Sequence, residues 1–221
     1  MISWALMDET KKEKLLTLPN ILTLLRILFT PVFLVMMIKR RPFESLLVFS
    51  VAGITDVLDG FAARTWHLKS KLGTLLDPAA DKLLMTVSYV LITIPGLNSP
   101  YAVPLWLTTA VIGRDLIILL GALLAFKLRG HKSFPPSLLG KISTVCQVAL
   151  VFLVLLANYA LTSAGGWNAA LSRLLTPAVL DWAYGVTFVT TLLSWIGYGV
   201  IGFGYLFPRK GKPETITNSY R

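Results

Sequence analysis

Residues 138–161 read LLGKISTVCQVALVFLVLLANYAL, in which Lys141 is the one charged side chain. A helix needs about 20 mainly apolar residues to cross a hydrocarbon core of roughly 30 Å. Five further apolar runs of comparable length lie between charged residues and Pro or Gly: 20–38, 43–63, 73–94, 102–126 and 177–207. Such continuous runs do not fit the alternating strands of a membrane barrel. The sequence therefore predicts an all-α integral membrane protein with six transmembrane helices.

The composition also indicates a membrane protein. Of 221 residues, 55% are hydrophobic and 14% charged, whereas a soluble domain carries about 25% charge. Together with the apolar runs, this excludes a cytosolic globular enzyme, a disordered chain and a nucleic-acid binder whose net charge of +10 coats a folded surface. The connections between runs are short, so residues 1–221 are expected to form a single membrane domain.

The distribution of basic residues predicts the topology. Residues 1–18 mix apolar and charged side chains and are expected to form a short interfacial helix, and residues 208–221 a cytoplasmic tail. With both termini in the cytoplasm, fourteen Lys and Arg residues lie on that side and four on the other. The positive-inside rule favours this orientation. A local cluster, Lys39, Arg40 and Arg41, goes against it.

Four aspartates lie where apolar runs should be uncharged. Asp56 and Asp59 close the second run, and Asp77 and Asp81 open the third. Residues three or four apart share one face of a helix, and a short turn makes consecutive helices antiparallel. The two acidic faces are therefore expected to meet near the cytoplasmic end of the bundle. Ionised groups at this depth persist mainly when paired, when coordinating an ion or when lining a wet cavity.

Facing carboxylates repel one another unless cations lie between them. Two divalent ions would neutralise four aspartates, and all-oxygen ligation without His or Cys suits Mg²⁺ or Mn²⁺. Magnesium sites of this kind commonly complete their shells with substrate phosphates, which predicts a phosphate-bearing substrate. Two alternatives are structural pairing of the acids with Lys or Arg and a proton relay in a transporter.

Residues 56–81 read DVLDGFAARTWHLKSKLGTLLDPAAD. This segment resembles the signature of the CDP-alcohol phosphotransferases, D-x-x-D-G-x-x-A-R-x(8)-G-x-x-x-D-x-x-x-D, and agrees with it at all eight specified positions. The six apolar runs and the sequence PNILTLLR at 19–26 are also similar to this family, so the resemblance covers nearly the whole chain. Arg26 in that segment could reach either the membrane interface or the active cavity.

The resemblance implies a metal-dependent reaction on CDP-diacylglycerol that releases CMP. It implies that two divalent ions on the signature aspartates hold the diphosphate, with Asp81 also acting as the general base on the acceptor hydroxyl. The metal ligands would be Asp56, Asp59, Asp77 and Asp81. Phosphoryl transfer needs this charge neutralisation and an aligned nucleophile. Arg64 would donate to the diphosphate; its alternative role is a topology anchor.

Small residues of the signature have two interpretations. The resemblance makes Gly60, Ala63 and Gly73 walls of the cytidine pocket, while close packing of the two helices would require similar residues.

The acceptor alcohol depends on a second group of charged residues. Arg114 and Lys141 could line one cavity and bind the phosphate of an anionic acceptor, or Arg114 could simply pair with Asp115. We expect glycerol 3-phosphate as acceptor, which would give phosphatidylglycerophosphate. The alternative is phosphatidylglycerol, which would give cardiolipin, because an Asp after this Arg resembles the eukaryotic-type cardiolipin synthases.

Other expectations concern the surroundings of the enzyme. The resemblance implies a homodimer, and the topology implies a bacterial inner membrane with the active site toward the cytoplasm. No nucleic-acid partner is expected. Rival interpretations from other classes are an intramembrane prenyltransferase, a transporter and a structural bundle.

Overall fold

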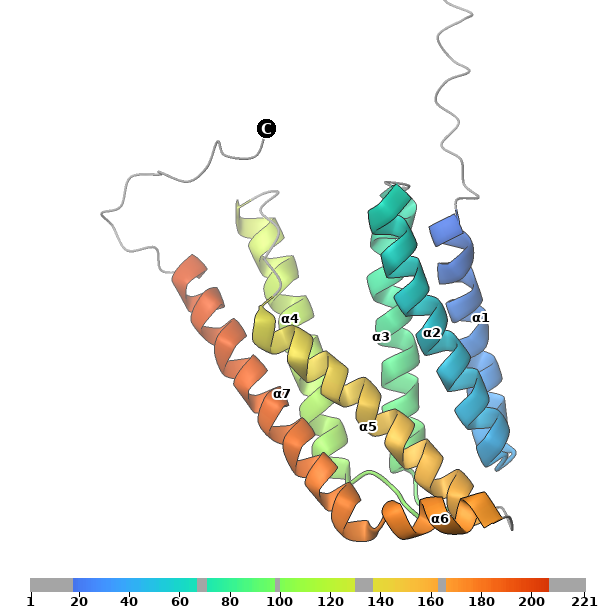
Figure 1. The fold of residues 1–221 in the computed structure, drawn as a ribbon. Coiled ribbons are helices and arrows are strands. Elements are labelled where there is room, and N and C mark those ends of the chain that lie inside the picture. The colour runs from blue at the N-terminus through green and yellow to red at the C-terminus, as the bar shows by residue number, and fades with distance from the viewer. Residues whose placement is uncertain (1–17, 67–70, 98–99, 130–136, 163–165, 207–221) are drawn as a thin grey trace, which may run out of the picture. The chain divides into compact units, whose positions relative to one another are not determined.

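The computed structural model describes residues 18–66, 71–97, 100–129, 137–162 and 166–206. Within the helices, the side chains of residues 18–23, 56–66, 71–79, 122–129 and 200–206 lie outside the described part. The described ranges contain no strand, which confirms the all-α prediction (Figure 1). Their helices are α1 (Leu18–Ile38), α2 (Pro42–Trp66), α3 (Lys71–Thr93), α4 (Leu105–Arg129), α5 (Leu138–Thr162), α6 (Gly166–Leu174) and α7 (Pro177–Leu206).

The six long helices match the six apolar runs to within a few residues at each end. The short helix α6 was not predicted, because its nine residues, GWNAALSRL, contain no apolar run and none of them is buried. The predicted interfacial segment 1–18 lies outside the described residues apart from Leu18, which begins α1. The predicted tail 208–221 lies outside them entirely.

The chain divides into two compact units. Unit 1 comprises Met1–Thr108 and Val148–Tyr184, and unit 2 comprises Thr109–Gln147 and Gly185–Arg221. Each unit is described by itself below, and the single membrane domain stays a prediction.

Helix α1 is the common partner of α2 and α3 in unit 1. Figure 1 shows α2 running antiparallel to α1 and to α3. The apolar stripe of α1 faces α2, where the rings of Phe33 and Phe49 lie 5.9 Å apart between centroids. Buried apolar side chains exclude solvent from this contact and stabilise it by about 25 cal/mol per Å² removed from water. The helices that carry the four aspartates are therefore both packed against α1.

Polar side chains of unit 1 form hydrogen bonds near the connection between α3 and α4. Asn158 of α5 accepts a hydrogen bond from the Tyr101 N–H (2.9 Å) and donates one to the Tyr101 carbonyl (2.8 Å). The hydroxyls of Thr93 and Thr108 also bond to each other. The two hydrogen bonds of Asn158 satisfy backbone groups of Tyr101 that would otherwise be unpaired between α3 and α4.

A buried polar network links two helices of unit 2. The amide nitrogen of Gln147 on α5 donates to the hydroxyls of Ser143 (3.2 Å) and Thr191 (3.3 Å), the latter on α7. Buried amides are costly without such partners, so this network fixes the register of the two helices.

The surface of the helices is rich in apolar side chains. Leu116, Leu119 and Leu120 on α4 and Trp182 on α7 are all more than half exposed. Among the described stretches, Leu138–Thr162 and Pro177–Gly199 are long and apolar enough to cross a bilayer. Exposed apolar surface of this extent indicates contact with lipid, which supports membrane association. Six crossings stay a prediction.

Candidate active site

Helices α2 and α3 carry all the residues of the acidic signature. Asp56 and Asp59 lie on α2, and Asp77 and Asp81 lie on α3, as predicted. Of these four, Asp81 has its side chain in the described part. The side chains of the remaining signature residues lie outside it, namely Asp56, Asp59, Gly60, Ala63, Arg64, Gly73 and Asp77. The described side chains alone contain no group of three or more His, Cys, Asp or Glu able to hold a metal ion.

A buried arginine of α1 pairs with Asp81. The Arg26 guanidinium is 1% exposed, and its Nη1 lies 2.5 Å from Oδ1 of Asp81, whose side chain is 42% exposed. An ionised group is buried at tolerable cost only when it is paired in good geometry. The carboxylate therefore has one side held by a buried cation and another side accessible from outside.

A buried threonine follows Arg26 by one turn of α1. The Thr30 hydroxyl donates to the Arg26 carbonyl at 3.0 Å, and Thr30 is itself buried. Pro31 follows, and a proline in a helix interior removes one i→i−4 hydrogen bond. The sequence left the position of Arg26 open between interface and cavity; the structure assigns it to the acidic end of α3.

Arg114 forms a second buried cationic centre, in unit 2. Its Nη1 donates to Asp115 Oδ1 at 2.8 Å, which is the local ion pair predicted as one alternative. Its Nε and Nη2 donate to Ser194 Oγ at 3.1 and 3.0 Å, and Nη2 donates to the Gly140 carbonyl at 3.2 Å. These four hydrogen bonds occupy most of the five N–H groups of a guanidinium. Arg114 therefore ties α4 to α5 and α7 within unit 2.

An aromatic ring and a glycine complete this centre. The guanidinium carbon of Arg114 lies 5.7 Å from the centroid of the Tyr198 ring, within the range of a cation–π interaction. A Cβ at Gly140 would lie 2.7 Å from the Tyr198 hydroxyl oxygen and 3.0 Å from Ser137 Oγ. Glycine is therefore needed at position 140 for the ring to approach the arginine.

Lys141 follows Gly140 on α5 and is exposed. The Gly140 carbonyl accepts a hydrogen bond from Arg114 and Lys141 is the next residue of the chain, but a shared phosphate site of the Arg114 and Lys141 side chains stays a prediction. The two side chains differ in environment, because Arg114 is 4% exposed and already bonded within the protein.

Sequence reasoning missed Ser194 and Tyr198 as partners of Arg114. Hydroxyl groups are common on helices, and no local pattern distinguishes these two from others on α7. Arg26 did carry a signal, because an ionisable residue inside an apolar run is a functional candidate by default.

Comparison with known proteins identifies relatives of the chain. A family model described as CDP-alcohol phosphatidyltransferase matches residues 16–196. The chain is 36% identical over 200 residues to a cardiolipin synthase (CMP-forming) of Streptomyces coelicolor, a match that covers 86% of this chain and 83% of that protein.

Two further relatives differ from each other in activity. The chain is 34% identical over 155 residues to a CDP-diacylglycerol–glycerol-3-phosphate 3-phosphatidyltransferase of Escherichia coli, covering 67% of this chain and 82% of that protein. It is 35% identical over 164 residues to a human cardiolipin synthase (CMP-forming), covering 65% of this chain and 52% of that protein.

Proposed function

The chain belongs to the CDP-alcohol phosphatidyltransferase family, and on that premise we propose that it transfers a phosphatidyl group from CDP-diacylglycerol to phosphatidylglycerol. The products are cardiolipin and CMP. The enzyme class follows from the family, and the proposal adds the identity of the acceptor alcohol. It differs from glycerol 3-phosphate, which the sequence alone favoured.

The environment of Arg114 is the observation that favours phosphatidylglycerol over glycerol 3-phosphate as the acceptor. A phosphate monoester such as glycerol 3-phosphate carries about −1.5 to −2 charge at pH 7 and needs more than one cationic ligand. A phosphodiester such as phosphatidylglycerol carries a single charge. Because the Arg114 guanidinium is bonded to Asp115, Ser194 and Gly140, Lys141 is the cation we assign to the acceptor phosphate. The single positive charge of the exposed Lys141 side chain balances the single negative charge of a phosphodiester. The cardiolipin synthase from Streptomyces coelicolor, matched over 86% of this chain, supports the same acceptor.

The donor site is assigned to the acidic signature. Asp56, Asp59, Asp77 and Asp81 would hold two divalent cations, Mg²⁺ or Mn²⁺, because carboxylate oxygens are the ligands these ions prefer. The accessible carboxylate of Asp81 fits this role. When bound, the cations neutralise charge on the diphosphate oxygens of CDP-diacylglycerol.

Residues of α2 and α3 complete the donor site. Arg64 donates to the diphosphate, and its planar, permanently charged fork matches phosphate oxygens. Gly60, Ala63 and Gly73 line the cytidine, where side chains of this size let the nucleotide approach the helix backbones.

Asp81 acts as the general base on the acceptor hydroxyl. It removes the proton of the acceptor hydroxyl, whose oxygen forms a bond to the phosphatidyl phosphorus as the bond from that phosphorus to the CMP oxygen breaks. CMP carries away the electron pair of the broken bond, and the proton passes from Asp81 to solvent. Arg26 is a positioning residue, because it holds Oδ1 of Asp81 and touches no reacting atom. General-base catalysis of this kind contributes roughly 10²- to 10⁴-fold to the rate.

Product analysis tests the proposal. Purified protein is given CDP-diacylglycerol and Mg²⁺ with phosphatidylglycerol or with glycerol 3-phosphate, and the lipid formed is identified by mass spectrometry. We expect cardiolipin from the first mixture, and a raised KM for phosphatidylglycerol in Lys141→Gln but not in the control Lys39→Gln. Phosphatidylglycerophosphate from the second mixture, with no cardiolipin from the first, would contradict the proposal.

Glycerol 3-phosphate is the second candidate acceptor. The E. coli relative, named for this acceptor and matched over 82% of its own length, favours it. The same assay distinguishes the two. A bacterial inner-membrane location, an active site toward the cytoplasm and a homodimer stay predictions of the same proposal.

A further inference from the structure

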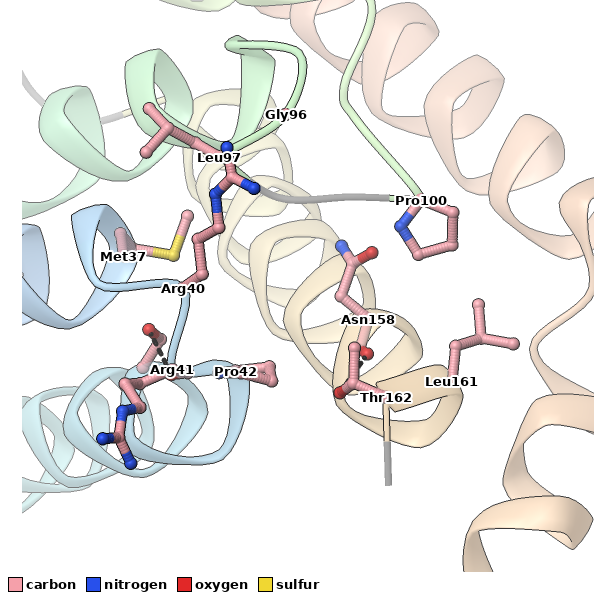
Figure 2. Close-up of a pocket in the computed structure, with 11 residues that line it drawn as sticks. Met37, Arg40, Arg41, Pro42, Gly96, Leu97, Pro100, Asn158, Leu161 and Thr162 are labelled. Atoms are coloured by element: carbon pink, nitrogen blue, oxygen red, sulfur yellow. Dashed lines mark hydrogen bonds between the residues drawn. The ribbon is translucent and has the colours of Figure 1, made fainter. Parts of the chain in front are cut away.

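Unit 1 contains a cavity of about 520 Å³ at the turn between α1 and α2. Its lining comes from the end of α1, the start of α2, the segment after α3 and the end of α5 (Figure 2). Binding pockets for small ligands commonly have volumes of about 300 to 1,000 Å³. The residues of the lining that matter below are Met37, Arg40, Gly96, Leu97 and Leu161.

This cavity is separate from the ion pair of Arg26 and Asp81 in unit 1. Arg26, which pairs with Asp81, and Ile38, the last residue of α1, are 12 positions apart along that helix. At a rise of about 1.5 Å per residue, that distance is about 18 Å. A ligand here would not contact Asp81.

Arg40 adopts a backbone conformation that normally favours glycine. Its φ is 53°, and it follows the last turn of α1, where its N–H bonds to the Met37 carbonyl and the Arg41 N–H bonds to the Met36 carbonyl, each at 3.0 Å. This is a Schellman ending, whose left-handed position is usually glycine because an L side chain there is strained. An arginine at this position is therefore not required by the fold.

The Arg40 side chain reaches across the cavity. Its Nη2 lies 4.0 Å from the position that a Cβ of Gly96 would occupy, and Figure 2 shows the guanidinium directed toward Gly96 and Leu97. The neighbouring Arg41 points away in the same view and donates to Glu44 at 3.4 Å. Counting only partners in the described ranges, the Arg40 guanidinium makes no hydrogen bond or ion pair. It is a cation available to a ligand.

The cavity also has an apolar border. Met37, Leu97 and Leu161 line it. Leu161 is exposed, as are Ile38 at the end of α1 and Phe43 at the start of α2, which are next in the chain to the lining residues Met37 and Pro42. A free phosphate ion would gain nothing from these side chains, whereas the acyl chains of a lipid would bury against them. A guanidinium matches phosphate oxygens with paired, charge-assisted hydrogen bonds.

We propose that this cavity binds the phosphate headgroup of an anionic phospholipid through Arg40, with the acyl chains against Ile38, Phe43 and Leu161. The site gives a reason for Arg40, one of the three basic residues at 39–41 that the topology rule leaves unexplained. It is independent of the acceptor used in catalysis.

Lipid binding in the absence of the donor CDP-diacylglycerol tests the site. Full-length protein in neutral detergent with EDTA and without CDP-diacylglycerol is titrated with phosphatidylglycerol, phosphatidylcholine or inorganic phosphate. Bound lipids are counted by native mass spectrometry, and Tm is followed. The variants are Arg40→Gly, whose backbone suits this position, Arg40→Asn, the other residue that tolerates it, and the control Lys39→Gln, which removes the adjacent charge.

We expect wild type and Lys39→Gln to bind one phosphatidylglycerol more than the Arg40 variants. Affinity for that lipid should fall at least about tenfold when the charge-assisted contacts of Arg40 are lost. The Tm of Arg40→Gly without lipid should equal or exceed that of wild type. Equal lipid counts in all four proteins, or equal retention of phosphatidylcholine, would overturn the proposal. A Tm rise with inorganic phosphate as large as with phosphatidylglycerol would indicate a small-anion site and overturn the lipid assignment. Phosphatidylglycerol is also the proposed acceptor, but no transfer can occur without CDP-diacylglycerol and metal, and the Arg40 variants keep Lys141. A difference in lipid count between these proteins is therefore independent of the transferase activity.

Discussion

Among the described side chains, each unit has a buried arginine beside an aspartate, yet the two pairs differ. Arg26 on α1 pairs with Asp81 on α3, which is 42% exposed. Arg114 pairs with the adjacent Asp115, which is 14% exposed, and with partners on α5 and α7. One arginine thus holds an accessible carboxylate, and the other is enclosed with its partner.

This difference in exposure indicates that Arg26 positions Asp81, whereas Arg114 stabilises the fold of unit 2. A buried charge that loses its partner remains uncompensated, and the cost is about 3–5 kcal/mol. A partly exposed carboxylate can be hydrated when its partner is removed, so the cost is smaller. We therefore expect changes around Asp81 to alter catalysis and changes around Arg114 to alter stability.

The largest effect is expected for Asp81→Asn. The amide cannot take the proton of the acceptor hydroxyl, so CMP release should fall by about 10²- to 10⁴-fold. Circular dichroism and gel filtration in detergent should match wild type. Turnover within tenfold of wild type would remove Asp81 from the mechanism.

Arg114→Met should give the largest loss of stability. It removes four hydrogen bonds and takes the cation away from the largely enclosed carboxylate of Asp115, so the free energy of unfolding should drop by about 3–5 kcal/mol. Chemical denaturation in detergent measures this. The matched variant Arg26→Met should lose less stability, and the reverse order would contradict the comparison.

Arg26→Met should affect turnover of the folded enzyme. The carboxylate of Asp81 loses its orientation, so kcat should fall about 10- to 100-fold while KM for CDP-diacylglycerol changes little. Arg26→Lys should recover part of kcat because it restores a cation. An unchanged kcat in Arg26→Met would show that the pair is structural only.

The smallest effect is expected for Ser194→Ala. Loss of this hydroxyl leaves the Nε of Arg114 without its acceptor, and a buried donor left unsatisfied costs about 1–3 kcal/mol. A Tm decrease with unchanged turnover below the transition is the expected result. Equal Tm values for wild type and variant would mean that another group replaces the serine.

Much of the fold was predictable from the sequence. Apolar runs of 20 or more residues define long helices because the backbone must satisfy its own hydrogen bonds in lipid. The short helix α6 was not predictable in this way, since none of its residues is buried. Its position follows from the end of α5 and the start of α7 rather than from its own pattern.

The site was predictable only where spacing carried information. Asp56, Asp59, Asp77 and Asp81 were assigned to two helices because offsets of three and four define a helix face. The contact between Arg26 and Asp81 spans 55 positions, and no local pattern encodes such a pairing. The need for glycine at 140 likewise depends on Tyr198, which is distant in sequence.

The dependence of CMP release on divalent metal tests the central claim most directly. Protein stripped with EDTA is given CDP-diacylglycerol and phosphatidylglycerol, and Mg²⁺ or Mn²⁺ is then added stepwise. We predict no CMP before addition, full recovery in wild type, and none at any metal concentration in Asp77→Asn. Metal-independent CMP release by the stripped enzyme, or wild-type recovery in Asp77→Asn, would contradict catalysis by ions held on the acidic faces of α2 and α3.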